Sequence, residues 1–530
     1  MSKTINDISR SLVAAAALVS LGACSDNWDD HYGPDSSLVA DTTVYEMIKS
    51  DPSLETFGRM IDIAGYAGLL DTSQTFTVWA PDNEALAGVD LSDEDEVRRI
   101  VANHVARFNV STASSGDVRM YNGKVMRFDG NTFGGAELRR SDIVVRNGVM
   151  HVLASRIPYS YNIREYIDTH AETSSLSAFL RRFDENKFDE ASSAPIDIDE
   201  NGNTVYDSVK VVYNRLFQHP RLGLGDILAE DSVFTMVVPD NNAWRAAYDR
   251  ISPLFNVYDA DPERADSIRD VQTSLAIVRD LIFRQRVTDP GSLSSLTATS
   301  GSILPDPAGL FSGAEKINAS NGMIYLSPLV GYDTRATYFP EVGVEAEDAT
   351  GRVRGASTTI YTRSVDTSNP LFAQVSEGSY IEVLGTSTSA QPSVTFQIPN
   401  VLSGSYDIYV SIVPASIEDA SVTGDRTRLK FVLSYLGEDG KNKTKSFEDD
   451  TAFVTNATEM TVIKVTSGFQ FPVSNFVDNL WLMEEGNDLS TATFTTKLFV
   501  QTSVKNTEFN NNELTRSFRV DRVWLEPSDN

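Results

Sequence analysis

The amino-acid sequence predicts two similar α+β domains in tandem, followed by an all-β C-terminal sandwich of the jelly-roll type. Three observations lead to this prediction: a strand-to-helix corner occurs twice, a hairpin signal follows each corner, and short alternating runs fill the last part of the chain. At 530 residues the chain is long enough for three domains of ordinary size. We place them at residues 38–160, 161–338 and 339–530.

The repeated corner comprises Phe76–Leu86 and, almost in register, Phe234–Trp244. Each copy predicts a short apolar strand, then a proline whose predecessor is held extended. Asp and Asn follow, and their side-chain oxygens can cap a helix that begins at the next residues. In the first copy, strand alternation places Phe76 and Val78 on one face.

A second element follows each corner, as Ile143–Leu153 in the first copy and Ile317–Leu326 in the second. Each contains an Asn-Gly pair between apolar runs, which predicts a β-hairpin. The distance from proline to Asn-Gly is longer in the second copy, so the second domain carries insertions.

The two segments together resemble the fasciclin (FAS1) family, which has this corner and this later Asn-Gly strand. The family also has a Tyr-His pair on a helix between the two segments. His104 falls at the histidine position here, Asn103 replaces the tyrosine, and the second copy has Phe283 and Arg284. Fasciclin domains are generally α+β adhesion or matrix-binding modules without catalytic activity, so the resemblance implies binding.

His104 lies in an apolar stripe from Val97 to Phe108 that predicts an amphipathic helix. This placement favours a core histidine bonded to the backbone over a ligand or catalytic histidine. In the second domain the matching helix has Val271, Leu275, Val278 and Ile282 at helical spacing.

An insert in the second domain, Asp197–Ser208, has two interpretations. Asp197, Asp199 and Asn201 with Gly202 fit the first half of a calcium loop, but Ser208 stands where a bidentate Glu belongs. Apolar residues on both sides of Asn201-Gly202 instead favour two strands of a hairpin.

The C-terminal alternating runs resemble galactose-binding-like jelly rolls of carbohydrate-binding modules, on Val344–Ala349, Ser403–Val410 and Val520–Leu525. In that family two opening glutamates and a late aspartate hold a structural calcium ion. The resemblance therefore implies Glu345, Glu347 and Asp521 as ligands, while ordinary exposed-strand alternation is the other reading. No other cofactor is expected.

Sugar recognition normally uses an exposed aromatic side chain with polar groups beside it. Trp481, Tyr406 and Tyr380 are candidates by residue type. Each lies in an apolar alternating run, so the core is the alternative location.

The N-terminus predicts export and lipid anchoring. Residues 1–23 have basic residues before an apolar run too short to span a bilayer, as in a signal peptide. The run ends at Cys24, the one cysteine of the chain, in a segment that resembles the bacterial lipobox. Residues 24–37 then form the lipidated Cys and a polar tether, whose acidic cluster at 25–30 resembles the surface-export signal of Bacteroidetes-type outer-membrane lipoproteins.

The net charge and the absence of catalytic motifs exclude some classes of function. A net charge of −29 opposes binding to nucleic acid. No nucleophile elbow, zinc motif or phosphate-binding loop occurs, so we expect no enzyme activity.

We expect a surface-exposed outer-membrane lipoprotein that binds a glycan or protein. Its partners would be a TonB-dependent transporter and that transporter's surface lipoprotein, in a glycan or peptide uptake system. A glycan-cleaving enzyme and a purely structural subunit of the transporter complex remain alternatives, since the 74 acidic residues allow many carboxylate pairs.

Overall fold

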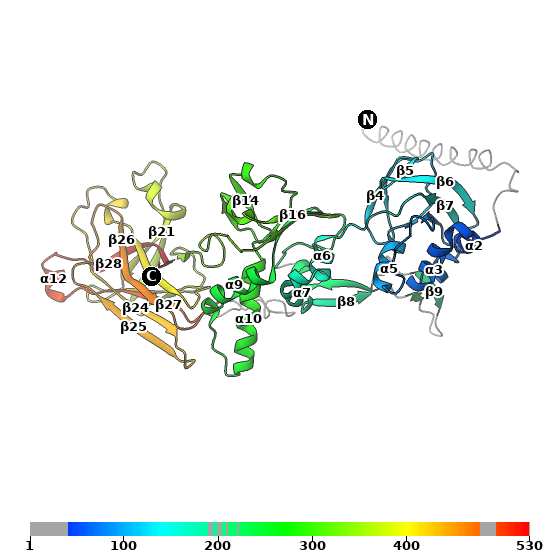
Figure 1. Ribbon diagram of the computed structural model, residues 1–530. Coiled ribbons are helices and arrows are strands. Elements are labelled where there is room, and N and C mark those ends of the chain that lie inside the picture. Colours follow the sequence, from blue (N-terminus) through cyan, green and yellow to red (C-terminus); the bar gives the residue numbers. More distant parts are fainter. Residues whose placement is uncertain are drawn as a thin grey trace, which may run out of the picture. The chain divides into compact units, whose positions relative to one another are not determined.

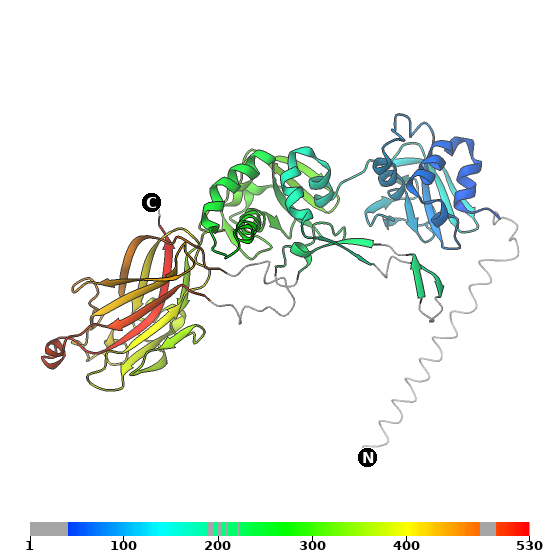
Figure 2. The ribbon, with the colours of Figure 1, turned by 90° about the horizontal axis from the view of Figure 1, so that it is seen from below.

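A computed structural model describes residues 41–188, 194–198, 204–207, 210–219, 222–476 and 494–528 (Figures 1 and 2). The chain divides into two compact units, one ending at Tyr161 and one beginning at Asn162. The second unit holds both the second repeat and the C-terminal sandwich. The predicted signal peptide (1–23), the tether (24–37) with Cys24, and Trp481 lie outside the described residues.

The first repeat packs helices against one side of a seven-stranded sheet of order β2-β1-β7-β6-β5-β4-β3. Its elements are α2 (Val44–Ser50), η2 (Pro52–Leu54), α3 (Glu55–Ala64), α4 (Ala67–Leu70), β1 (Phe76–Pro81), α5 (Glu94–Ala102), β2 (Val105–Arg107), β3 (Gly116–Arg119), β4 (Val125–Phe128), β5 (Thr132–Phe133), β6 (Ala136–Val145) and β7 (Gly148–Leu153). As predicted, Phe76 and Val78 share a face, in the core formed with the helices. Trp79 points to a second core on the other side, where its ring stacks on Phe133 at a centroid distance of 4.0 Å.

The second repeat has the same central strands within a four-stranded sheet of order β13-β12-β17-β16. Its elements are α6 (Ile163–Thr169), η3 (Ala171–Thr173), α7 (Ser174–Arg181), β8 (Asp184–Phe188), β9 (Ala194–Ile198), β10 (Thr204–Asp207), β11 (Lys210–Asn214), α8 (Arg215–Gln218), β12 (Phe234–Pro239), α9 (Asn241–Ile251), η4 (Ser252–Phe255), α10 (Pro262–Val278), β13 (Ile282–Phe283), η5 (Pro290–Ser292), β14 (Ser295–Thr297), β15 (Ile303–Pro305), η6 (Pro307–Phe311), β16 (Glu315–Ala319) and β17 (Gly322–Ser327).

The two corners end differently. In the second repeat Asp240 caps α9 by accepting hydrogen bonds from the N–H groups of Asn242 and Ala243, as predicted. In the first repeat the predicted helix is a succession of turns: Asp82 accepts from Ala85 N–H at 2.8 Å, and no α-helix lies between β1 and α5. Gly88, with φ of 86°, turns the chain away after this segment, so the helix prediction for the first copy is wrong.

Two helix lengths also differ from the prediction. Helix α5 ends at Ala102, and the stripe continues into strand β2, with Phe108 77% exposed at a φ of 70°. Ile282 belongs to β13, where it pairs with Met236 of β12, and not to α10. In both places a turn sends the chain into an edge strand, and apolar spacing alone does not distinguish such a strand from another helical turn.

The repeats share one strand register. Strand β1 runs parallel to β7 with Phe76 opposite Gly148, and β12 runs parallel to β17 with Phe234 opposite Gly322. A Cβ at Gly148 would lie 1.9 Å from Phe76 O, and one at Gly322 would lie 1.8 Å from Phe234 O. Only glycine fits at these positions, because another side chain would overlap the neighbouring backbone.

The predicted Asn-Gly hairpins are confirmed: β6 pairs with β7 and β16 pairs with β17, antiparallel. The asparagines also hold distant segments. Asn147 accepts from Val44 N–H at 2.8 Å and donates to the carbonyls of Leu70 and Thr72 at 2.9 and 2.8 Å. Asn321 repeats this pattern with Ile163 N–H and the carbonyls of Ile227 and Ala229.

The insert of the second repeat is a hairpin. Strands β9 and β10 pair antiparallel, with Thr204 opposite Ile198 and Val205 opposite Asp197. Strands therefore flank the loop where a calcium loop of the EF-hand type has helices, so the hairpin interpretation is confirmed. Residues 199–203 lie outside the described residues.

The C-terminal region is a two-sheet β-sandwich, as predicted. One sheet has the order β20-β21-β28-β23-β26, with β18 also paired to β28, and the other has the order β19-β22-β27-β24-β25. Its elements are β18 (Val342–Glu345), β19 (Arg352–Arg354), β20 (Thr358–Ser364), η7 (Phe372–Gln374), η8 (Ser376–Gly378), β21 (Ser379–Gly385), β22 (Ser393–Gln397), β23 (Ser405–Ile412), η9 (Ala415–Ile417), β24 (Leu429–Leu436), β25 (Asn442–Glu448), β26 (Thr461–Gln470), β27 (Lys497–Thr502), α12 (Asn506–Asn510) and β28 (Ser517–Pro527). Inward residues of both sheets form one core, including Phe396, Phe431 and Val523.

Hydrogen bonds join the second repeat to the sandwich within the second unit. Ser403 of the sandwich donates its hydroxyl to Pro253 O at 2.8 Å and accepts from Asn256 N–H at 2.9 Å. Ser474 donates its hydroxyl to Leu254 O, within η4 of the repeat, at 2.7 Å. These buried polar contacts fix the sandwich against η4 and so shape the space beside it.

Candidate functional site

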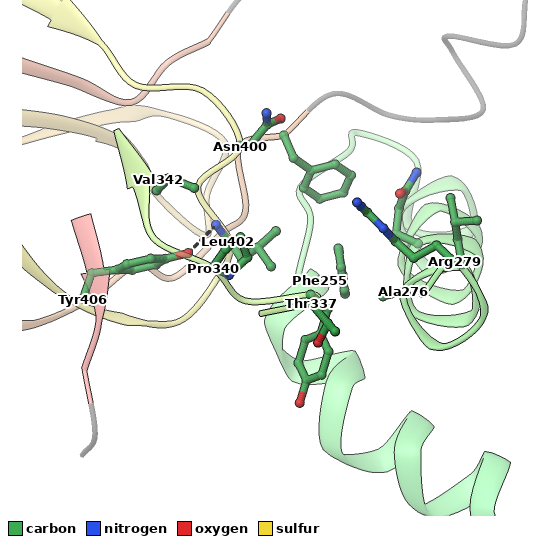
Figure 3. A pocket seen from close by; sticks show the side chains of 13 residues that line it. Phe255, Ala276, Arg279, Thr337, Pro340, Val342, Asn400, Leu402 and Tyr406 are labelled. Carbon is green, nitrogen blue, oxygen red and sulfur yellow. Dashed lines mark hydrogen bonds between the residues drawn. The ribbon is translucent and has the colours of Figure 1, made fainter. Parts of the chain in front are cut away.

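A pocket of about 400 Å³ lies between the second repeat and the sandwich (Figure 3). Phe255 at the end of η4 and Ala276 of α10 line it on one side, and Leu402 and Tyr406 line it on the other. The full lining is Phe255, Gln272, Leu275, Ala276, Arg279, Thr337, Tyr338, Pro340, Val342, Asn400, Leu402, Tyr406 and Phe476. Such a volume, mostly apolar with a few polar groups, suits a small-molecule or side-chain ligand.

The polar groups of this pocket are fixed by the fold. Tyr406 reaches from β23, and its hydroxyl oxygen accepts from Leu402 N–H at 3.1 Å (Figure 3). Burial raises the pKa of Tyr406 well above its ordinary value, so the phenol stays neutral. Arg279 follows α10 and points into the pocket, with its Nε 3.6 Å from Asp280 Oδ1. The pocket can therefore offer one cation beside apolar walls.

The three carboxylates predicted to hold calcium influence one another at the start of the sandwich. Glu345 closes β18, Glu347 follows it, and Asp521 lies on β28. Burial, together with the charges of the two glutamates, raises the pKa of Asp521 to about 6. Burial and the charges of Glu345 and Glu377 also raise the pKa of Glu347.

Two oxygens of this cluster lack hydrogen-bond partners: Glu345 Oε2 and Glu347 Oε2 are buried and unpaired. Buried oxygens that repel one another are the donors that calcium prefers. The protein itself offsets part of this negative charge: Asp521 Oδ1 accepts from Ser376 N–H at 2.8 Å, and Arg522 Nε lies 3.7 Å from Glu345 Oε1. Among the described residues no group of three His, Cys, Asp or Glu side chains has the arrangement of a metal site. The calcium assignment thus stays a prediction.

Two sugar-platform candidates are core residues. Tyr380 is 2% and Tyr406 1% exposed, so neither ring is available on the surface. An aromatic pair that the sequence analysis missed lies on the outer face of the sandwich, where Tyr409 and Trp524 stack with centroids 5.2 Å apart. Lys464 lies over Tyr409 and Arg522 over Trp524, at 5.0 and 4.9 Å from the ring centroids. These cations occupy ring faces that a sugar would need.

His104 is a core histidine, as the sequence favoured. Its Nδ1–H donates to Ile100 O at 2.7 Å, and its Nε2 accepts from Ile157 N–H at 3.2 Å. Burial lowers its pKa to about 4, so the ring is neutral at physiological pH. These two hydrogen bonds of His104 join the end of α5 to the chain after β7.

The family model described as Fasciclin domain matches residues 52–157, which confirms the resemblance within the first repeat. The comparison with curated proteins gives no match. Within the part of the chain that the structure describes, no helix has the length and apolar character needed to cross a membrane.

Among solved structures, a FAS1 domain pair of the insect cell adhesion molecule fasciclin I is 14% identical, covering 54% of this chain and 98% of its own, with a TM-score of 0.19. The C-terminal family 22 carbohydrate-binding module of Clostridium thermocellum Xyn10B is 10% identical, covering 36% and 94%, with a TM-score of 0.22. The xylan-binding CBM22-1 domain of Paenibacillus barcinonensis Xyn10C is 8% identical, covering 36% and 94%, with a TM-score of 0.21. With TM-scores this low, we draw no conclusion about function from these structural similarities.

The predicted fold class is confirmed: two α+β fasciclin-like domains in tandem and an all-β sandwich. The coarse functional class supported by the fasciclin match is a binding or adhesion module.

Proposed function

We propose that this chain is a non-catalytic binding lipoprotein of the outer membrane, displayed on the cell surface as an accessory of a glycan or peptide uptake system. The observation that carries the binding class is the fasciclin match of residues 52–157. The anchoring part of the proposal is supported by Cys24, the one cysteine of the chain, after an apolar leader. Several acyl chains at about 0.8 kcal/mol per buried methylene would hold such a protein on a membrane.

The pocket beside Tyr406 supports a binding role for the second unit. It opens where hydrogen bonds of Ser403 and Ser474 join η4 to the sandwich, so its walls are already in place before a ligand arrives. Preformed walls reduce the entropy lost on binding. Arg279, whose charge is balanced by the nearby Asp280, supplies N–H donors that would favour a ligand with hydrogen-bond acceptors.

Anchoring and display are tested on intact cells. Added protease should degrade the wild-type protein on intact cells, and Cys24→Ala should move the protein from the membrane fraction to the soluble fraction. Protection of the wild-type protein on intact cells, with degradation only after lysis, would contradict surface display.

Catalysis is tested with the full-length chain and a panel of polysaccharides. We expect no release of reducing ends above the rate without protein. Product release that survives repurification would instead support the glycan-cleaving enzyme.

A further inference from the structure

A second cleft, of about 490 Å³, lies in the first unit between the end of α5 and the chain after β7. Helix α5 contributes Glu96, Arg99 and Ile100 to its lining. The segment after β7 contributes Arg156, Ile157, Pro158, Tyr159 and Tyr161. Its size is that of a small-molecule site.

Two arginines give this cleft a positive character in a chain of net charge −29. Arg99 is half-buried, and its guanidinium has no hydrogen bond or ion pair to any residue that the structure describes. Arg156 pairs with Glu96, Nη1 to Oε1, at 3.1 Å and stays 44% exposed. The neighbouring Arg98 lies outside the cleft and pairs with Glu94 at 2.8 Å. Glu96 is thus the one carboxylate in the lining against two arginines, and it pairs with Arg156, which leaves the charge of Arg99 available.

Two aromatic rings stand beside the arginines. Tyr159 and Tyr161 are half-buried, with ring centroids 5.2 Å apart and planes at 74°. Lys124, 1% exposed, places its Nζ 4.8 Å from the Tyr159 ring centroid. This cation–π contact holds the Tyr159 ring in place.

Buried hydrogen bonds of His104 join the two walls of the cleft. His104 donates to Ile100 O on the helix side and accepts from Ile157 N–H on the other side. Ile100 and Ile157 both line the cleft, so this neutral histidine fixes its width. The arginines and tyrosines are therefore presented by a framework that needs little rearrangement on binding.

We propose that this cleft binds a sugar ring that carries a carboxylate or a sulfate. A planar guanidinium pairs with either anion through two parallel N–H donors, and Arg99 has its donors available. An aromatic side chain beside the arginines suits the apolar C–H groups of a sugar, and Tyr161 lines the cleft. The proposal rests on the proposed binding function and names the ligand class for the first unit.

The test is calorimetric titration of the full-length chain with tetragalacturonate, a sulfated heparin tetrasaccharide, a neutral xylotetraose and tetraglutamate. We expect binding of one or both anionic sugars, which also tells carboxylate from sulfate, and at least tenfold weaker binding of xylotetraose and tetraglutamate. Raising NaCl from 50 to 500 mM should weaken the binding of the anionic sugar.

Matched variants locate the site. Arg99→Gln should weaken binding at least about tenfold, because a charge-assisted pair is lost, whereas Arg98→Gln on the same helix should change it less than twofold. Tyr161→Ala should weaken binding in the same way, and unchanged hydrogen exchange in β1 would show that the domain stays folded.

Any of three results would overturn the inference. They are an affinity for xylotetraose or tetraglutamate equal to that for the anionic sugar, equal effects of the two arginine variants, and no binding of either anionic sugar. Surface display and partner capture do not depend on Arg99, so failure here is distinguishable from failure of the proposed function.

Discussion

Replacing Asn147 with aspartate should destabilise the first unit alone. Asn147 is 4% exposed, and its Nδ2 donates to the carbonyls of Leu70 and Thr72. Aspartate keeps the shape and can still accept from Val44 N–H. Its second oxygen, however, has no donors and faces two carbonyl oxygens.

The expected cost follows from these contacts. The buried carbonyl of Leu70, left without a donor, costs roughly 1–3 kcal/mol. Thr72 is exposed and its bond is only part-buried, so water can replace much of that bond, and the two losses together give roughly 1–4 kcal/mol. Repulsion of a buried carboxylate adds to this or is relieved by its protonation. Against a domain stability of about 5–15 kcal/mol, such a loss is large but leaves a folded population.

Hydrogen exchange followed by mass spectrometry measures this change segment by segment, which avoids treating a multidomain chain as one transition. In Asn147→Asp, amides of β1 and β7 should exchange with an opening free energy lower by about 1–4 kcal/mol, while β12 and β17 stay unchanged. Asn321→Asp is the matched control and should give the reverse pattern. A loss below about 1 kcal/mol, or equal losses in both units, would refute the role assigned to these asparagines.

Three further predictions concern stability. Gly322→Ala should prevent stable folding of the second repeat, because the new Cβ would lie 1.8 Å from Phe234 O. A Cβ at Gly309 would meet nothing within 4 Å, so Gly309→Ala should change the midpoint of urea unfolding little. Normal hydrogen-exchange protection of β12 in Gly322→Ala would contradict the prediction. His104 has a pKa of about 4 in the folded state against 6.5 in the unfolded state. Its contribution of roughly 3 kcal/mol to stability is therefore complete above pH 6.5 and is lost as the pH falls toward 4. Protection of β1 amides from hydrogen exchange should drop over this range, and should drop less in His104→Gln. Asp521 has a folded pKa of about 6 against 3.8, so its cost to stability grows as the pH rises from 3.8 and is complete above pH 6. In EDTA at pH 7.5, Asp521→Asn should therefore raise the melting temperature of the sandwich. If calcium binds, adding it should raise the melting temperature of the wild type but not of the variant.

Local signals in the sequence were enough for much of the fold. The alternation of Phe76 and Val78, the cap at Asp240 and the hairpins at Asn147 and Asn321 depend on neighbours along the chain, and the structure confirms them. The helix expected after Asp82 is wrong because the chain leaves its turns at Gly88, which short-range capping preferences do not reveal.

Long-range contacts explain what the sequence left undetermined. The parallel register of β1 and β7 brings together residues far apart in the chain, and so does the contact of Asn147 with Val44. Family resemblance pointed to the carboxylates around Asp521, but only the folded structure shows that Glu345 Oε2 and Glu347 Oε2 are buried without hydrogen-bond partners. The cleft of Arg99 and Arg156 gave no local signal, since its two walls meet only in the folded domain.

The most direct test of the central claim is purification of the lipidated protein from its native outer membrane in mild detergent, with mass spectrometry of the proteins that accompany it. Co-purification of a TonB-dependent transporter and its surface lipoprotein, absent when Cys24→Ala is used as bait from the soluble fraction, is the result expected of an uptake accessory. Recovery of the lipidated protein alone, under conditions that preserve other transporter complexes of the same membrane, would contradict the accessory role.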